Sequence, residues 1–190
     1  IETTGGKFND EAITEIAIYK FDGEKILDQF ISLVNPEKKI QPFVEKLTGI
    51  NSKMLINAPK FFEIAKRIIE ITEDCIIVAH NINFDYRILN IEFSRLGFKF
   101  NKATLCTVEL SKSLIPKLPS YKLGKLVKSL GIPIKNRHRA FGDAKATVLL
   151  FKLLLDEDTS KKIITQKIID VNGNKVKTKF IDMIDQTKPK

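Results

Sequence analysis

The sequence lacks the features of several large protein classes. Its two cysteines, Cys75 and Cys106, form no CxxC pair, so we expect no zinc site and no disulfide. Both thiols are expected to be buried, in a protein of the reducing cytoplasm. No apolar run approaches the ~20 residues of a membrane-spanning helix, and no signal-peptide pattern opens the chain. The sequence therefore predicts a cytoplasmic protein without a membrane partner.

Acidic residues are scarce in one long stretch of an otherwise basic chain. The 190 residues carry a net charge of +9, with 27 lysines against 5 arginines. The stretch from Ser111 to Arg139 contains no acid and eight basic residues: Lys112, Lys117, Lys122, Lys125, Lys128, Lys135, Arg137 and Arg139. Such a stretch can be a solvated helical face or a surface that follows nucleic-acid phosphates.

The hydrophobic pattern predicts an α/β fold with one core. An alternating strand over 14–21, a turn at Asp22-Gly23 and a returning strand over 26–34 form a hairpin. Cys75–Ala79 reads as a fully buried strand, and Leu105–Leu114 fits a strand or a helix. Helices are expected after Pro42 and after Pro59, and over 83–96, 121–130 and 142–155. We therefore expect a mixed sheet with helices on its faces.

Two of these helices carry an aspartate in the first turn of their core-facing stripe. Asp85 shares a face with Leu89 and Phe93, and Asp143 stands in the same relation to Leu150 and Leu154. The helix dipole alone could favour an acid there. The only two histidines, His80 and His138, precede these aspartates by five residues. Carboxylates gathered at the rim of a sheet favour a hard cation, because burying unpaired anions is costly.

The chain opens on Ile1-Glu2-Thr3-Thr4-Gly5-Gly6, which is typical of the end of a strand followed by a glycine turn. A domain that starts inside a strand is expected to have further residues before it. We therefore expect the natural chain to begin a few residues earlier.

Three motifs in this order resemble the DEDDh (DnaQ-like) 3′→5′ exonuclease superfamily, which includes the proofreading epsilon subunit of bacterial DNA polymerase III. Residues 1–5 resemble its first motif, Asp-x-Glu-Thr-Thr-Gly, without the leading aspartate, which would precede Ile1. Residues 80–85 resemble the second motif, and residues 138–143 the third. Residues 47–50 resemble the loop near the terminal nucleotide.

The resemblance implies a ribonuclease H-like fold with a mixed five-stranded sheet flanked by helices, and two Mg²⁺ (or Mn²⁺) ions per site. It assigns Glu2, Asp85 and Asp143 as metal ligands and His138 as the general base. His80 is expected to have a structural hydrogen-bonding role. Without the leading aspartate, which bridges both metals in the family, the chain as given is expected to bind metal poorly.

By the same resemblance, the substrate is the 3′ end of a single strand, DNA in first place, and a DNA polymerase subunit is a candidate partner. The residues expected to line the terminal-nucleotide pocket are Thr3, Thr4, Thr48 and Phe84. Two alternatives remain: an RNA-trimming enzyme of the RNase T or oligoribonuclease type, and a nucleic-acid-binding homologue without hydrolysis.

The C-terminal part lies outside the resemblance. We expect the exonuclease domain over residues 1–157 and an extension over 158–190. Within the extension, residues 165–181 read as a hairpin that turns at Asn172-Gly173.

Overall fold

The computed structural model describes residues 1–170 and 173–175. Within them the strands are β1 (Glu2–Thr3), β2 (Ile13–Phe21), β3 (Ile26–Leu33), β4 (Ile77–Ala79) and β5 (Thr104–Cys106). The helices are α1 (Pro42–Thr48), α2 (Ser52–Leu55), α3 (Phe61–Ile71), α4 (Ile82–Arg95), α5 (Thr107–Leu114), α6 (Leu123–Ser129), α7 (Ala140–Glu157) and α8 (Lys162–Lys167). The alternation of strands and helices confirms the predicted α/β class.

The five strands pair in both orientations. β1, β2 and β3 form an antiparallel sheet in that order, and β4 and β5 form a parallel pair. Across β1 and β2, Glu2 lies opposite Glu15. In the described part of the chain the hydrogen-bond ladders thus divide the mixed set of strands into a group of three and a group of two.

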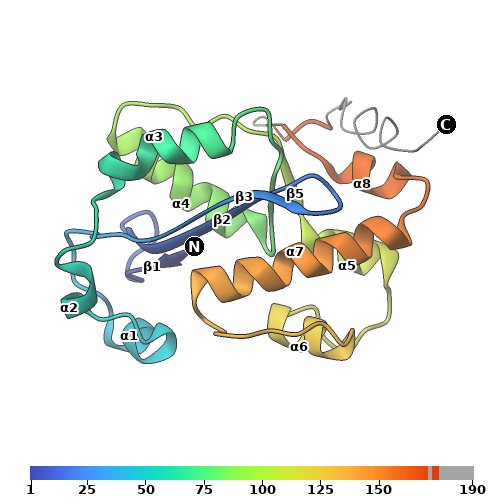
Figure 1. The fold of residues 1–190 in the computed structure, drawn as a ribbon, viewed down its shortest axis with the longest axis horizontal. Coiled ribbons are helices and arrows are strands. Elements are labelled where there is room, and N and C mark those ends of the chain that lie inside the picture. Colours follow the sequence, from blue (N-terminus) through green and yellow to red (C-terminus); the bar gives the residue numbers. More distant parts are fainter. Residues whose placement is uncertain (171–172, 176–190) are drawn as a thin grey trace.

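Helices cover both sides of the strands (Figure 1). α3 and α4 lie on one side, where Ile16, Ile68, Ile88 and Phe93 form a fully buried core. α5, α6 and α7 lie on the other side, where a second core contains Leu105, Leu110, Leu126, Leu150 and Leu154. α7 packs along β2, so the position of its first turn depends on that strand.

Several local predictions need correction. The strand predicted over Cys75–Ala79 is shorter, Ile77–Ala79, and it is half-buried rather than fully buried. The thiols of Cys75 and Cys106 are free and also half-buried. The ambiguous segment Leu105–Leu114 contains both elements, because β5 ends at Cys106 and α5 begins at Thr107.

The C-terminal prediction was wrong at its beginning. Thr165 lies in α8, whose Ile164 is buried in the same core as α7, and Ile168 follows it there. An antiparallel bridge joins Ile169 to Lys175. The rest of the predicted hairpin, residues 171–172 and 176–181, lies outside the described residues.

No helix in the described part of the chain is long and apolar enough to cross a membrane.

Candidate active site

Three carboxylates from three elements meet at the N-terminal end of the chain. Glu2 lies in β1, and Asp85 and Asp143 lie in the first turns of α4 and α7. The positive end of each helix dipole favours an acid in that turn. The Ile1 ammonium donates a hydrogen bond to Asp85 Oδ1 at 3.0 Å. The fold therefore brings together all three acids that the sequence predicted as metal ligands.

The environment of Glu2 and Asp143 opposes their ionisation. Burial raises the pKa of Glu2 to about 7, against the lowering effect of the Ile1 ammonium, and Asp143, Glu15 and Asp85 add repulsion in the same direction as burial. Burial also raises the pKa of Asp143, partly offset by the nearby charge of His138. Neighbouring anions that are buried together favour protonation unless a cation joins them.

The three acids offer the type of oxygen donor that a hard divalent cation prefers. Asp143 Oδ1 is buried and finds no hydrogen-bond partner among the described residues. A buried acceptor without a partner is costly, and carboxylate oxygens are the ligands that Mg²⁺ prefers. Among the described residues, no three or more His, Cys, Asp or Glu side chains are arranged as a group that could hold a metal ion. Of the three acids, Asp85 is bound to the ammonium.

The two histidines occupy different environments. His138 is half-buried and lies in the irregular segment before α7, with a left-handed backbone (φ 62°). His80 lies 2.9 Å through Nδ1 from Thr107 Oγ1 and 2.8 Å through Nε2 from the Tyr121 carbonyl oxygen. The carbonyl can only accept, so Nε2 carries the proton, and burial lowers the pKa of His80. His80 thus has the hydrogen-bonding environment that its predicted structural role requires.

The three predicted pocket threonines are buried and hold turns. Thr4 Oγ1 donates to the Gly5 carbonyl and accepts from Ala12 N. Thr3 Oγ1 accepts from Gly5 N, and Thr48 Oγ1 bonds to backbone atoms of its own helix end. Phe84 is half-buried and packs on the core beside α3 and α4. Contact of these four residues with a nucleotide stays a prediction.

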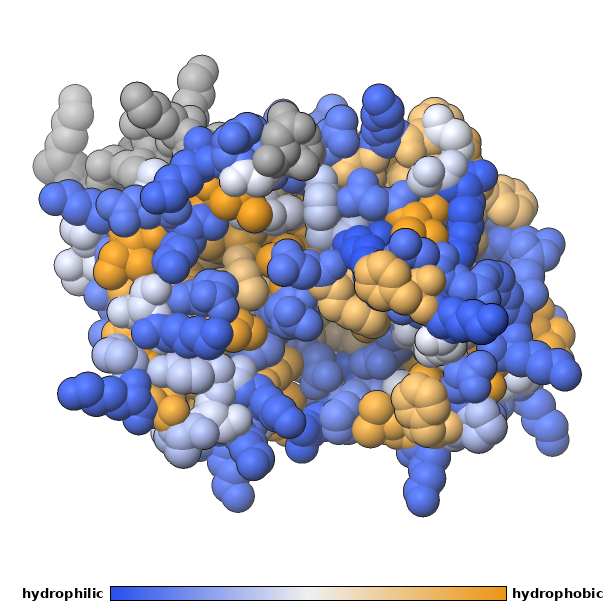
Figure 2. All heavy atoms as spheres, turned by 180° about the vertical axis from the view of Figure 1, so that it is seen from behind, coloured by the Kyte–Doolittle hydropathy of each residue, from blue (hydrophilic) through white to orange (hydrophobic). Residues whose placement is uncertain are grey.

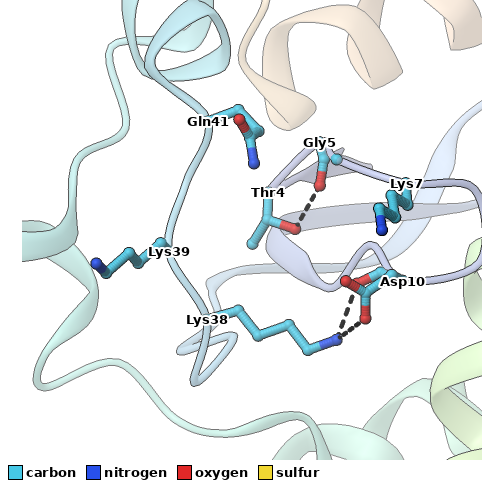
Figure 3. Close-up of a pocket in the computed structure, with 8 residues that line it drawn as sticks. Thr4, Gly5, Lys7, Asp10, Lys38, Lys39 and Gln41 are labelled. Atoms are coloured by element: carbon cyan, nitrogen blue, oxygen red, sulfur yellow. Dashed lines mark hydrogen bonds and ion pairs between the residues drawn. The ribbon is translucent and has the colours of Figure 1, made fainter.

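A cavity of about 500 Å³ opens after the end of β1, and none of the three predicted metal ligands belongs to its lining. Its lining residues are Thr4, Gly5, Gly6, Lys7, Asp10, Lys38, Lys39 and Gln41. Figure 3 shows Lys38 turned toward Asp10, to which it is ion-paired at 2.6 Å, while Lys39 points away from that pair. Of the predicted nucleotide-contacting residues, only Thr4 belongs to this lining. Figure 2 shows a hydrophilic hollow on the face opposite to the view of Figure 1.

Sequence reasoning missed two residues at the edge of the site. Glu15 is 2% exposed on β2, and Arg139 at the start of α7 forms an ion pair with it at 2.6 Å. The sequence did carry a signal for Glu15, because an acid inside an apolar strand needs a partner. Arg139 had been counted among the basic residues that could face phosphates, and its pairing removes it from that set.

Comparison with known proteins gives one consistent result. A sequence family described as Exonuclease matches residues 1–151. The PolC-type DNA polymerase III of Caldanaerobacter subterraneus is 39% identical over 158 residues, which are 83% of this chain and 11% of that protein. The 3′-5′ exonuclease DinG of Staphylococcus epidermidis is 34% identical over 168 residues, or 88% of this chain and 19% of that protein. The chain thus spans a fifth or less of these relatives.

Solved structures of the same shape confirm the ribonuclease H-like fold. Exonuclease X in complex with 5′ overhanging duplex DNA has a TM-score of 0.68 and 25% identity, and covers 83% of this chain and 89% of that one. E. coli Exonuclease I in complex with a dT13 oligonucleotide has a TM-score of 0.74 at 20% identity, and the match covers 84% of this chain and 40% of that one. The nuclease domain of 3′hExo, a DEDDh family member bound to rAMP, has a TM-score of 0.70 at 21% identity. This match covers 83% of this chain and 89% of that one.

Proposed function

The chain belongs to the Exonuclease family, and from this premise we propose that it is a metal-dependent 3′→5′ exonuclease acting on single-stranded nucleic acid, DNA in first place. One observation carries the proposal: Glu2, Asp85 and Asp143 converge from three elements, with His138 beside Asp143. The products would be nucleoside 5′-monophosphates. The family's DEDDh motifs, matched here from Glu2 onward, support the same reading.

Each residue has a distinct task in the proposed reaction. Glu2, Asp85 and Asp143 would hold two Mg²⁺ or Mn²⁺ ions, which stabilise charge on the attacking and leaving oxygens of the phosphodiester. His138 would remove the proton from the attacking water, for which an imidazole is suited near neutral pH. A bound cation would lower the raised pKa of Glu2 and of Asp143 and so keep both acids in the ionised form that acts as a ligand.

The substrate strand would enter beside β1. Thr3, Thr4, Thr48 and Phe84 would surround the terminal nucleotide. The adjoining cavity carries Lys7 and Lys39 in addition to the Lys38–Asp10 pair, so its charge suits a phosphodiester backbone. DNA is proposed first because the printed names of relatives include a DNA polymerase, and two of the structures hold DNA or dT13. The rAMP complex of 3′hExo keeps RNA as the second candidate.

Three further features of the proposal concern the partner of the enzyme, its compartment and the extent of its domain. The likeness to a PolC-type polymerase supports association with a DNA polymerase. The two free cysteines suit a reducing cytoplasm, which we propose as its compartment. Residues 158–190 are proposed as an extension of the exonuclease domain, and α8 contributes to the same core.

The decisive experiment compares two chains extended by one residue before Ile1. Either extension converts the Ile1 ammonium, which pairs with Asp85, into a peptide amide. An added aspartate also supplies the expected fourth carboxylate, whereas an added alanine does not. With Mg²⁺, the aspartate chain should shorten a 5′-labelled single strand stepwise from its 3′ end, EDTA should stop the reaction, and the alanine chain should be much slower. Matched DNA and RNA strands then rank the two substrates.

The outcomes separate the hypotheses. Degradation by the aspartate chain that continues in excess EDTA would overturn the two-metal mechanism. Binding of single strands without any shortening would favour the homologue that lacks hydrolysis. Faster shortening of the RNA strand would replace DNA by RNA as the substrate.

A further inference from the structure

Glu15 forms a buried polar junction between β2 and the start of α7. Its carboxylate accepts from Arg139 Nη2 at 2.6 Å and from Arg139 Nε at 3.1 and 3.2 Å. Glu15 Oε2 also accepts from the backbone amide of Ala140 at 2.7 Å. Hydrogen bonds that join two charged groups at a fixed fork geometry are about twice as strong as neutral ones. We refer to Glu15, Arg139 and the Ala140 amide as the β2–α7 junction.

The junction lies between two residues of the proposed reaction. His138 immediately precedes Arg139, and Asp143 lies one turn into the helix that Ala140 begins. The Asp143 amide in turn donates to the Arg139 carbonyl at 3.1 Å. Since Ala140 is the first residue of α7, its amide has no partner within the helix, and Glu15 supplies one. The junction therefore fixes the first residue of α7. It also fixes the backbone positions from which the side chains of His138 and Asp143 extend.

The segment before α7 is held closely from its other side. A Cβ atom built on Gly142 would collide with the carbonyl oxygens of Lys135 and Asn136, so this segment lies directly on the first turn of the helix. Asn136 and His138 both have left-handed backbones, a conformation that Asn and His adopt more readily than most other non-glycine residues. Tyr19, on the same face of β2 as Glu15, adds a hydrogen bond from its hydroxyl to the Phe141 carbonyl at 3.4 Å.

The junction also controls charge beside Glu2. Glu15 lies opposite Glu2 across β1 and β2, so the two acids share one face of the sheet. Arg139 pairs with Glu15 and so compensates the charge of this acid. Its positive charge also attracts the Glu2 carboxylate. Like charges directly opposite each other destabilise a strand pair unless one is compensated.

We propose that Glu15 is a positioning residue for the reaction: through Arg139 and the Ala140 amide it fixes the first turn of α7, and so places His138 and Asp143 relative to Glu2. This inference rests on the proposed function. The junction is 2% exposed at Glu15 and binds no part of the substrate in this role. Its loss should therefore lower kcat more than it changes KM, because a misplacement of about 1 Å can cost up to about 10²-fold in rate.

The test uses Glu15→Gln and Arg139→Lys in the aspartate-extended chain. Gln keeps the size of the side chain and loses its charge, and Lys keeps the charge and loses the fork that bonds twice. Each variant should lower kcat by about 10- to 100-fold with KM changed less than about threefold. The double variant should cost no more than the worse single one, because the two residues act through one junction. Amide hydrogen exchange at Ala140 should become faster in Glu15→Gln.

A matched control lies on α4. Glu92 is 7% exposed, accepts from the Ile13 amide at 2.9 Å and pairs with Arg95 at 3.2 Å, so it is a second buried acid that joins a backbone amide to an arginine. It lies two turns beyond Asp85. Glu92→Gln should lower Tm and speed exchange at Ile13 while kcat, measured well below every Tm, stays within about twofold.

The outcomes are distinct for the inference and for the proposed function. If the aspartate-extended parent degrades no strand, the proposed function and the inference both fail. If the parent is active and the Glu15→Gln and Arg139→Lys variants keep full kcat while losing Tm, the junction is only structural and the inference alone fails. If Glu15→Gln does not fold, Arg139→Lys decides the question by whether it lowers kcat more than it changes KM.

Discussion

At the scale of single residues, the site is defined by acids whose surroundings disfavour their charge. Glu2 is placed by β1 between Asp143, Asp85 and Glu15, with the Ile1 ammonium as a compensating cation. Asp143 has one buried oxygen that finds no hydrogen bond among the described residues. Such an arrangement lowers stability without a cation and raises affinity for one. Perturbed acids in a hollow are therefore informative about function, and they also make pH-dependent stability measurable.

The raised pKa of Glu2 predicts that stability falls with pH in the absence of metal. The folded chain keeps a proton up to about pH 7, whereas the unfolded chain releases it near its ordinary value of 4.5. The unfolding free energy should therefore decrease between about pH 4.5 and 7, by at most about 1.4 kcal/mol per pH unit for one proton. Asp143, whose pKa is also raised, acts in the same direction.

Urea unfolding at pH 5, 6 and 7, with EDTA present, measures this effect. Glu2→Gln cannot ionise and should flatten the profile over the same range, and Mg²⁺ should restore stability most at pH 7. A wild-type profile as flat between pH 5 and 7 as that of Glu2→Gln would contradict the assignment.

The proposed division between ligand and base predicts two different variants. Asp143→Asn should abolish metal binding and turnover together, because it removes a charged oxygen ligand from a buried place. His138→Ala should lower turnover by about 10²–10⁴-fold and leave metal affinity nearly unchanged, which is the usual loss for a general base. Isothermal titration with Mn²⁺, in parallel with rates, separates them. Much weaker Mn²⁺ binding by His138→Ala would make this histidine a ligand.

At the scale of elements, the basic stretch from Ser111 to Arg139 divides into two groups. Arg139 is paired with Glu15, and the Arg137 guanidinium lies against Gly124 of α6, so both arginines contribute to packing. By contrast, the lysines of α6 and its cap, Lys122, Lys125 and Lys128, are all exposed. At spacings of three residues they share one side of the helix, as the sequence predicted.

If α6 follows the substrate backbone, its three lysines should govern salt dependence. Replacing Lys122, Lys125 and Lys128 together with Gln should raise KM and flatten the salt dependence of binding, with saturated kcat little changed. Each lost phosphate contact lowers the slope by roughly 0.7 on a single strand. Gln at Lys25, Lys66 and Lys99, which are exposed elsewhere, gives the same change in net charge. Equal slopes for the two triple variants would make α6 an ordinary solvated face.

At the scale of the whole molecule, local sequence patterns were sufficient to locate the motifs. They were insufficient to predict which faces of the helices are covered. The first turns of α4 and α7, with Asp85 and Asp143, were predictable because helix starts and apolar spacing are local properties. The helix expected after Pro59 forms as α3, but its apolar residues did not reveal which face is covered, since Phe62 and Ile69 are exposed while Phe61, Ile64 and Ile71 are buried. Which face of an apolar helix is covered depends on its neighbours, and so does the pairing of Glu15 with Arg139.

The proposed function predicts that the whole molecule needs a free strand end. The acids and His138 lie where β1, α4 and α7 meet. A site that holds a terminal nucleotide requires a free 3′ hydroxyl. The aspartate-extended chain should therefore degrade a linear single strand, and a circular strand of the same sequence should survive for the whole reaction. One endonucleolytic cut, added as a control, should make the circle a substrate. Linearisation of the intact circle by the enzyme itself would contradict an exonuclease and indicate an open cleft that accepts internal phosphodiesters.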